Sequence, residues 1–326
     1  MIRTLLGPVD FYGRPRPVLG LHCYIIQAGT FALAAYLFMS WDFSGLALMP
    51  PEAFARPARD LLFQYWTTPW FYWTTLQFIY EIIPRPTIVV LQTMQIATIV
   101  ALWCGLFGIL PRLAAWVALM LGAHLIGMFL IGGDTMDAST TVLLFLLFVV
   151  ALFPRGAYYQ LGISAEPMAL STRFHGPVFI LLLFMDSYYF FSGFNKIADV
   201  GIGWVLAAHT ELWSKAAIEN SLFVSSFSTS LWFNSILSIK WLAGMAALLI
   251  FALELLAPFC LFLPRWSPAF LIFFAAMHVS IYLSLGYGYW TNTGADLMLL
   301  PYTAIVARLR SHQRRSQAIG VEQPAE

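Results

Sequence analysis

Long apolar segments, separated by polar or aromatic connections, dominate this chain. A helix needs about 20 mostly apolar residues to cross about 30 Å of hydrocarbon, and fewer where it packs among neighbours. This pattern predicts an all-α integral membrane protein, a polytopic bundle of about eight transmembrane helices, of which the fourth and eighth are short. The predicted spans are Leu19–Met39, Thr87–Leu110, Leu113–Ile131, Thr140–Phe153, Val178–Phe194, Trp241–Leu263, Ala269–Leu285 and Asp296–Ala307.

Two long connections, residues 40–86 and 197–239, are rich in Trp, Tyr and Phe. Such rings favour the headgroup layer, so we expect interfacial or re-entrant helices there, on the outer side, roofing a cavity between the spans. Residues 1–308 are predicted to form one transmembrane domain. The polar residues 309–326 are predicted to be a disordered cytoplasmic tail.

Composition supports the membrane class, because 60% of the residues are hydrophobic and only 10% are charged. A soluble domain averages about 25% charged residues. The net charge of +1 suggests neither nucleic acid nor an acidic protein as partner, so the expected partner is the lipid bilayer. Three scattered cysteines without a CxxC pair indicate neither a disulfide framework nor a zinc site.

Basic residues indicate the orientation of a multi-pass protein. With eight spans and a cytoplasmic N-terminus, eleven Lys and Arg residues fall on inside segments and six on outside segments. We therefore expect both termini in the cytoplasm, as in a bacterial inner-membrane protein. The N-terminus lacks the layout of a cleaved signal peptide, so the first apolar segment is expected to stay as an anchor.

Lys196 ends the fifth apolar segment and is one of only three lysines in the chain. A cationic side chain at membrane depth costs several kcal/mol unless it is paired, neutral or extended to the interface. If residues 178–196 form one helix, then Tyr189, Ser192, Gly193 and Lys196 share a face. A dry pocket would favour the neutral amine, which alone can accept a proton. The alternatives are an interfacial lysine that reaches outward, or an ion pair with Asp199.

Other polar residues lie inside predicted spans. His278 could orient a ligand oxygen or relay a proton, or it could make a structural hydrogen bond between helices. Glu254 and Asp186 are intramembrane acids that should have partners, which the sequence does not name. His124 lies within the third span.

Further polar residues occur in the predicted outer loops. Asp134 and Asp137 suit a helix cap or a solvated loop better than a metal site, and His209 and Glu211 could line the roof of the cavity. The chain has no His-x-x-x-His or Glu-x-x-His pair, so no metal site is predicted. It also has no Gly-x-Ser-x-Gly motif, P-loop or dinucleotide fingerprint.

Three motifs resemble one known family in order and spacing. The first is Tyr189-Phe190-x-x-Gly193-x-x-Lys196-Ile197 followed by Gly203-Trp204-Val205, the second is Leu253–Phe259, and the third runs from Ala276-Met277-His278 to Gly286. Together they resemble the horizontally transferred transmembrane (HTTM) domain of the vitamin K-dependent gamma-carboxylase family. The resemblance covers roughly residues 10–308, with specific motifs at 189–205 and 250–301.

The resemblance implies a quinone-dependent lyase-type mechanism. The family's motif lysine is the base that activates reduced vitamin K, so Lys196 would deprotonate a hydroquinone that then reacts with oxygen. The resulting strong base would remove a proton from a carbon acid, and carbon dioxide would capture the carbanion. A water-excluding pocket would protect that base. The expected cofactor is a reduced quinone of the vitamin K or menaquinol type. Catalytic roles are predicted for Lys196 and His278, and cofactor-binding roles for Tyr189, Ser192, Gly193, Trp204 and Glu254.

The chain also departs from the family pattern. Residues 309–326 leave no room for the large extramembrane region that binds the propeptide and glutamate-bearing protein, and Asn195 replaces a second basic residue. The predicted substrate is therefore a small molecule or lipid. One alternative is a non-catalytic quinone- or lipid-binding protein, or a structural subunit of a larger membrane complex. The other is a proton-coupled transporter, which no inverted repeat supports.

Overall fold

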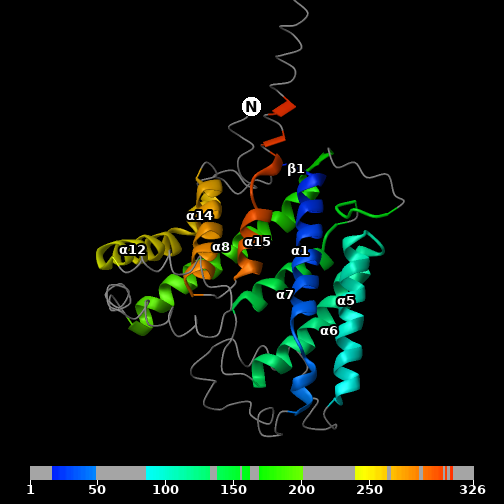
Figure 1. Cartoon of the computed structure of the whole chain (residues 1–326). Helices are drawn as coiled ribbons and strands as arrows, with labels where there is room; N and C mark the ends of the chain where they lie inside the picture. Colours follow the sequence, from blue (N-terminus) through cyan, green and yellow to red (C-terminus); the bar gives the residue numbers. More distant parts are fainter. Residues whose placement is uncertain are drawn as a thin grey trace, which may run out of the picture. The chain divides into compact units, whose positions relative to one another are not determined.

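Helices account for most of the chain that the structure describes (Figure 1). In the computed structural model the described residues are 17–48, 86–132, 138–154, 156–161, 169–200, 239–262, 266–285, 289–303, 305–306 and 309–310. Among them, four helices are long and apolar enough to cross a membrane: Gly20–Ser40, Ile88–Leu106, Pro111–Met128 and Thr172–Ala198. The predicted helical fold is thus confirmed, with four candidate membrane spans among the described residues, and the count of eight spans stays a prediction.

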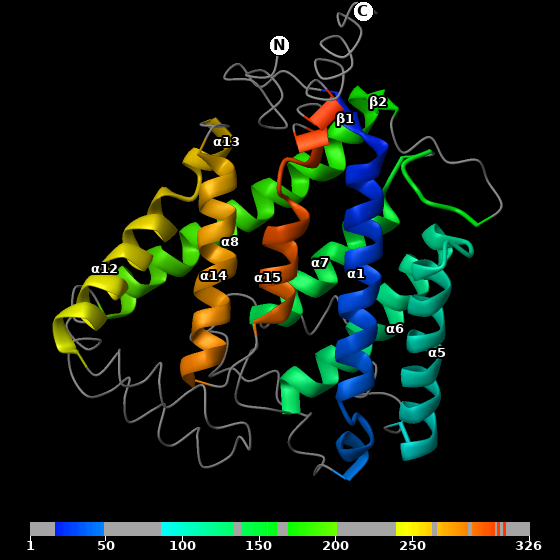
Figure 2. The same cartoon turned by 45° about the horizontal axis from the view of Figure 1, so that its top comes forward.

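The chain divides into two compact units, residues 24–166 and residues 1–23 with 167–326. The first unit contains most of α1 (Gly20–Ser40), η2 (Ser44–Leu48), α5 (Ile88–Leu106), α6 (Pro111–Gly132) and α7 (Ala138–Ala151). Helix α6 packs against both α5 and α7 (Figure 2).

The turn between α5 and α6 follows from its sequence. Thr87 caps the N-terminus of α5, where its side chain accepts a hydrogen bond from the backbone N–H of Val90 at 3.4 Å. It ends in a Schellman motif, in which Ile109 N donates to Cys104 O and Gly108 N donates to Gly105 O. Gly108 has φ = 76°, a conformation that costs other residues free energy. Pro111 then starts α6, where a missing N–H is tolerated.

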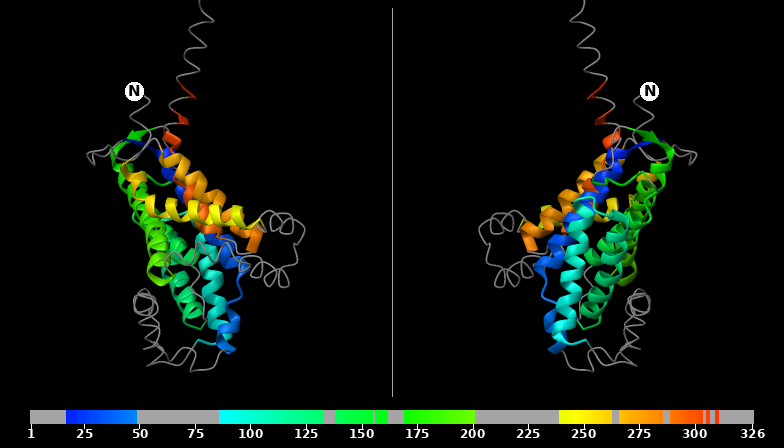
Figure 3. Two further views of the ribbon diagram at one scale, coloured as in Figure 1. Left: turned by 90° about the vertical axis from the view of Figure 1, so that its left-hand side faces the viewer. Right: turned by 90° about the vertical axis from the view of Figure 1, so that its right-hand side faces the viewer.

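The second unit holds the candidate functional residues. It contains β1 (Val18–Leu19), β2 (Leu170–Ser171), η4 (Thr172–Phe174), α8 (His175–Val200), α12 (Lys240–Leu256), α13 (Phe259–Phe262), α14 (Ser267–Leu285) and α15 (Trp290–Met298). Helix α12 packs against α8, and α14 packs against α15 (Figure 3). The short α13 contacts both α8 and α14.

Strand β1 and the first turn of α1 form hydrogen bonds to the end of α15 and to the segment that follows it. Strands β1 and β2 pair antiparallel. Leu19 N donates to Thr303 Oγ1 at 3.1 Å, and His22 Nε2 lies 2.9 Å from the carbonyl oxygen of Met298. These bonds satisfy buried polar groups and position α15 within its unit.

Two predicted spans differ from the helices observed. The sixth, Trp241–Leu263, is divided into α12 and α13, because Pro258 has no N–H to donate into a continuous helix. The eighth was placed from Asp296 onward, but α15 covers residues 290–298 and stops before Pro301. Buried Thr291 and Asn292 belong to this helix, although both precede the predicted start of the span.

We predict that Gly108→Ala destabilises the protein, whereas Gly45→Ala does not. A Cβ at residue 108 would lie 2.9 Å from the backbone nitrogen of Leu161 and would require positive φ, whereas a Cβ at residue 45 would meet nothing within 4 Å. The left-handed conformation alone costs about 1–2 kcal/mol. Thermal unfolding of both variants in detergent measures the difference, and equal midpoints would contradict this account of the turn.

Candidate functional site

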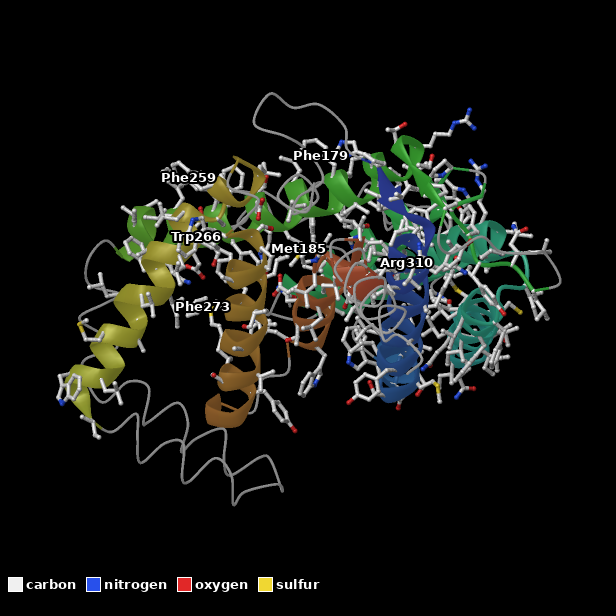
Figure 4. All side chains as sticks on the ribbon, turned by 90° about the horizontal axis from the view of Figure 1, so that it is seen from above. Phe179, Met185, Phe259, Trp266, Phe273 and Arg310 are labelled. Carbon is white, nitrogen blue, oxygen red and sulfur yellow. The ribbon has the colours of Figure 1, made fainter. Side chains whose placement is uncertain are left out.

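One face of α8 carries small and polar residues along a single line. Asp186, Tyr189, Ser192, Gly193 and Lys196 follow one another at spacings that place them on adjacent turns of one face. Asp186 is 2% exposed and Tyr189 1% exposed. We refer to the line of Asp186, Tyr189, Ser192, Gly193 and Lys196 as the polar stripe of α8. Figure 4 labels Met185, the buried neighbour of Asp186, and Phe273 on α14.

Lys196 forms an ion pair with Glu254 of α12. Its Nζ lies 2.6 Å from both carboxylate oxygens, and Ser192 Oγ donates to Glu254 Oε1 at 3.2 Å. The side chain of Glu254 is 4% exposed and that of Lys196 is 22% exposed. Charge-assisted bonds of this geometry are what a buried carboxylate requires in an apolar setting.

Gly193 allows the ion pair to form. A Cβ at this position would lie 3.0 Å from the Cβ of Glu254 and 3.3 Å from the backbone nitrogen of Leu255. Contacts to backbone atoms at this distance cannot be relieved by rotating a side chain. The glycine therefore brings α8 and α12 close enough for Lys196 and Ser192 to reach the carboxylate.

A second cluster centres on Tyr189, two turns before Lys196. The Tyr189 hydroxyl donates to Asp296 Oδ2 of α15 at 2.7 Å and lies 3.0 Å from His278 Nε2 of α14. Its ring stacks on Phe274 with centroids 3.8 Å apart and an interplanar angle of 8°. All four side chains are buried. We call Tyr189, His278 and Asp296 the tyrosine cluster.

The hydrogen bonds of Tyr189 indicate which ring nitrogen of His278 carries the proton. A tyrosine hydroxyl carries one proton. When Asp296 is ionised and accepts the hydrogen bond from Tyr189, His278 Nε2 donates to the tyrosine oxygen. Nδ1 of His278 is then an acceptor. In the part of the chain that the structure describes, neither this nitrogen nor Asp296 Oδ1 has a hydrogen-bond partner, although both atoms are buried.

The ion pair and the tyrosine cluster interact electrostatically within the unit. Lys196 interacts with His278, and Glu254 with Tyr189. Asp186, one turn before Tyr189 on α8, interacts with Asp296. A change of protonation in one cluster therefore changes the electrostatic energy of the other, because interactions between charges are stronger at low dielectric.

The structure brings most of the sequence-predicted residues together in one unit. These are Tyr189, Ser192, Gly193, Lys196, Glu254 and His278. The shared face on α8 is confirmed. The partner that the sequence did not name for Glu254 is Lys196, for which the sequence had suggested Asp199 as one alternative. The functional roles assigned to these residues stay predictions.

Sequence reasoning missed Asp296, which was used only as a helix boundary. The sequence did offer one indication of a role for Asp296: it is a carboxylate in a predicted span, and the preceding span contains His278. His124 is buried in α6, in the other unit. Several predicted features lie outside the described residues: Trp204 with the 203–205 motif, Asp134, Asp137, His209, Glu211, the side chain of Asp199, most of the two aromatic connections and most of the tail.

We predict unequal effects when either partner of the ion pair is neutralised. Lys196→Met leaves a buried carboxylate without its cation and should destabilise the protein by about 3 kcal/mol. Glu254→Gln should cost less, because the partly exposed Lys196 can turn toward water. The double variant should recover much of the loss, and Arg173→Met, at an exposed position, is the control. Unfolding midpoints in detergent test this, and a double variant less stable than Lys196→Met would contradict it.

The chain matches no protein-family model, no curated protein and no solved structure. The resemblance of its motifs to the vitamin K-dependent gamma-carboxylases stays a prediction, and the interpretation of the site depends on its own geometry.

Proposed function

We propose that this protein is a membrane enzyme that binds a reduced quinone and takes a proton from it at Lys196, acting on a small or lipid substrate. The observation that carries the proposal is the Lys196–Glu254 pair, held between two apolar helices at 2.6 Å. A lysine and a carboxylate in direct contact can pass a proton between them. The polar stripe of α8 places both beside the tyrosine cluster.

The pair supplies a way to make a neutral amine. When a proton moves from Lys196 Nζ to a carboxylate oxygen of Glu254, both groups lose their charge, which an apolar environment favours. The amine then has a lone pair that can accept a hydroxyl proton, and Glu254 keeps the first proton. Ser192 holds Oε1 in place throughout. Lys196 acts in this proposal as the base, and Glu254 holds the proton that Lys196 has given up.

The residues present fit an aromatic head group that carries hydroxyls. Tyr189 and Phe274 form a stacked aromatic pair, and the buried acceptor His278 Nδ1 has no partner among the described residues. When bound, a hydroquinone would supply reducing electrons for oxygen chemistry. Lys196 and Ser192 would orient one of its hydroxyls, and His278 would accept a hydrogen bond from another.

The motif resemblance supports the same assignment. Lys196 and His278 occupy motif positions of the carboxylase-like family, so a lyase or oxygenase that depends on a quinol is the expected reaction class. Gamma-carboxylation of protein glutamate is not part of the proposal. Trp204, in the same motif, is proposed as a further cofactor contact.

A non-catalytic role is the second candidate, and one observation favours it. Glu254 already accepts two bonds from Lys196 and one from Ser192, as in a purely structural connection between helices. The protein would then bind a quinone or lipid passively, or serve as a subunit of a larger membrane complex. Stable partner subunits that co-purify with it would favour this candidate.

We predict that Lys196→Arg keeps the fold and abolishes turnover. Arginine can form the same paired hydrogen bonds to Glu254, but it stays protonated and cannot act as a base. Purified protein in nanodiscs would be given a short-chain reduced naphthoquinone, and oxygen consumption above the protein-free rate would be measured. We expect at least about a hundredfold loss, the usual contribution of a general base. Arg173→Lys is the matched control. Wild-type turnover in Lys196→Arg would exclude Lys196 as the base, whereas a wild-type protein with no oxygen consumption above the protein-free rate would favour the non-catalytic candidate.

The proposed location is a bacterial inner membrane with both termini in the cytoplasm, supported by the distribution of arginines. Reporter fusions at residue 326 and at the connection near Lys215 should report opposite sides, because that connection is expected outside. The same side for both fusions would contradict the orientation.

A further inference from the structure

The geometry points to a proton relay through the tyrosine cluster, in which His278 passes a proton through Tyr189 to Asp296. This relay is separate from the Lys196–Glu254 pair and uses different donors and acceptors. It connects α14, α8 and α15 through two hydrogen bonds of 3.0 Å and 2.7 Å. No role in the proposed function has yet required Asp296.

The starting arrangement leaves the relay ready to accept one proton. His278 Nε2 donates to the Tyr189 oxygen, and the Tyr189 hydroxyl donates to Asp296 Oδ2. The receiving atom is His278 Nδ1, a buried acceptor that has no partner among the described residues. A carboxylate at the other end provides the driving force, since an isolated charge in an apolar setting is costly.

The transfer balances with one proton entering and one stored. A proton binds His278 Nδ1 as the Nε2 proton moves to the Tyr189 oxygen and the Tyr189 proton moves to Asp296 Oδ2. The products are neutral His278 protonated on Nδ1, neutral Tyr189 and neutral Asp296. Both hydrogen bonds persist with their directions reversed, so no side chain must move.

The groups that face the cluster are consistent with Asp296 as the end of the relay. Asp186 of α8 interacts with Asp296, and both carboxyl groups are buried. Lys196 interacts with His278, and Glu254 and Tyr188 interact with Tyr189.

The relay also deepens the proposed function, and this part rests on it. A hydroquinone has two hydroxyl groups. The Lys196–Glu254 pair accepts the proton of one, and the relay accepts the proton of the other at His278 Nδ1. A bound hydroquinone would supply two electrons to oxygen, and none of these side chains would carry them.

The relay is tested without any quinone. Full-length protein in nanodiscs, with ¹⁵N-labelled histidine, would be titrated with acid. NMR would follow the tautomer of His278, identified by the loss of its signals in His278→Gln. Infrared spectroscopy would follow the carbonyl stretch of protonated Asp296, identified by its loss in Asp296→Asn. In the wild type we expect the change from Nε2–H to Nδ1–H and the protonation of Asp296 at one pH midpoint.

Removing the connecting hydroxyl should uncouple the two events. In Tyr189→Phe the midpoints should separate by about one pH unit or more, a tenfold change in relative proton affinity. In Asp296→Asn the tautomer change should be lost, which gives a second test if Tyr189→Phe does not fold. Tyr302→Phe is the matched control, because its hydroxyl bonds the Leu297 carbonyl in the same unit, outside the relay.

Two results would overturn the relay. One is protonation of Asp296 in the wild type with no change of tautomer at His278, as static hydrogen bonds would give. The other is an unchanged, coincident pair of midpoints in Tyr189→Phe. Neither result depends on Lys196→Arg turnover, so failure of the relay and failure of the proposed quinol chemistry are distinguishable.

Discussion

The need to satisfy the buried Glu254 carboxylate organises the second unit. A side chain that is 4% exposed between apolar helices cannot stay ionised without a cation and hydrogen-bond donors. Lys196 and Ser192 supply them, and both depend on Gly193, which has no Cβ to hold α12 away from α8. Pro258 ends regular helical bonding soon after Glu254, and the chain then continues as α13, which contacts α8 and α14.

The polar stripe of α8 links this ion pair to the tyrosine cluster by simple helical geometry. Seven residues make about two turns, so Tyr189 and Lys196 face the same way about 10 Å apart along the axis. Helix α12 covers the Lys196 end, and α14 and α15 provide the partners of Tyr189. One rigid helix thus holds two groups that can handle protons in a fixed relation. This arrangement suits positioned chemistry better than side chains on separate loops.

Local features of this structure could be predicted from the sequence, and the pairing of distant segments could not. Apolar length predicted the helices α1, α5, α6 and α8 closely, and helical spacing predicted that Tyr189, Ser192 and Lys196 share a face. The sequence suggested Asp199, close to Lys196 along the chain, as its partner, because local spacing does not reveal a contact with Glu254, 58 residues away. Asp296 was missed because the polar residues before it resemble a loop, although they are buried in α15. In the described chain, the hydrophobic pattern predicts where helices run better than it predicts which polar residues are buried between them.

The distinction between a structural ion pair and a working base depends on what surrounds it. A structural pair needs only its own mutual bonds, and the contacts of Glu254 satisfy that need. The tyrosine cluster is different, because it directs three titratable groups toward one another and leaves acceptor atoms open at both ends within the described chain. Open buried acceptors cost free energy, so a fold selected only for stability would fill them or replace them with apolar groups. Their presence beside a lysine–carboxylate pair therefore favours a site built to receive protons over one built only to join helices.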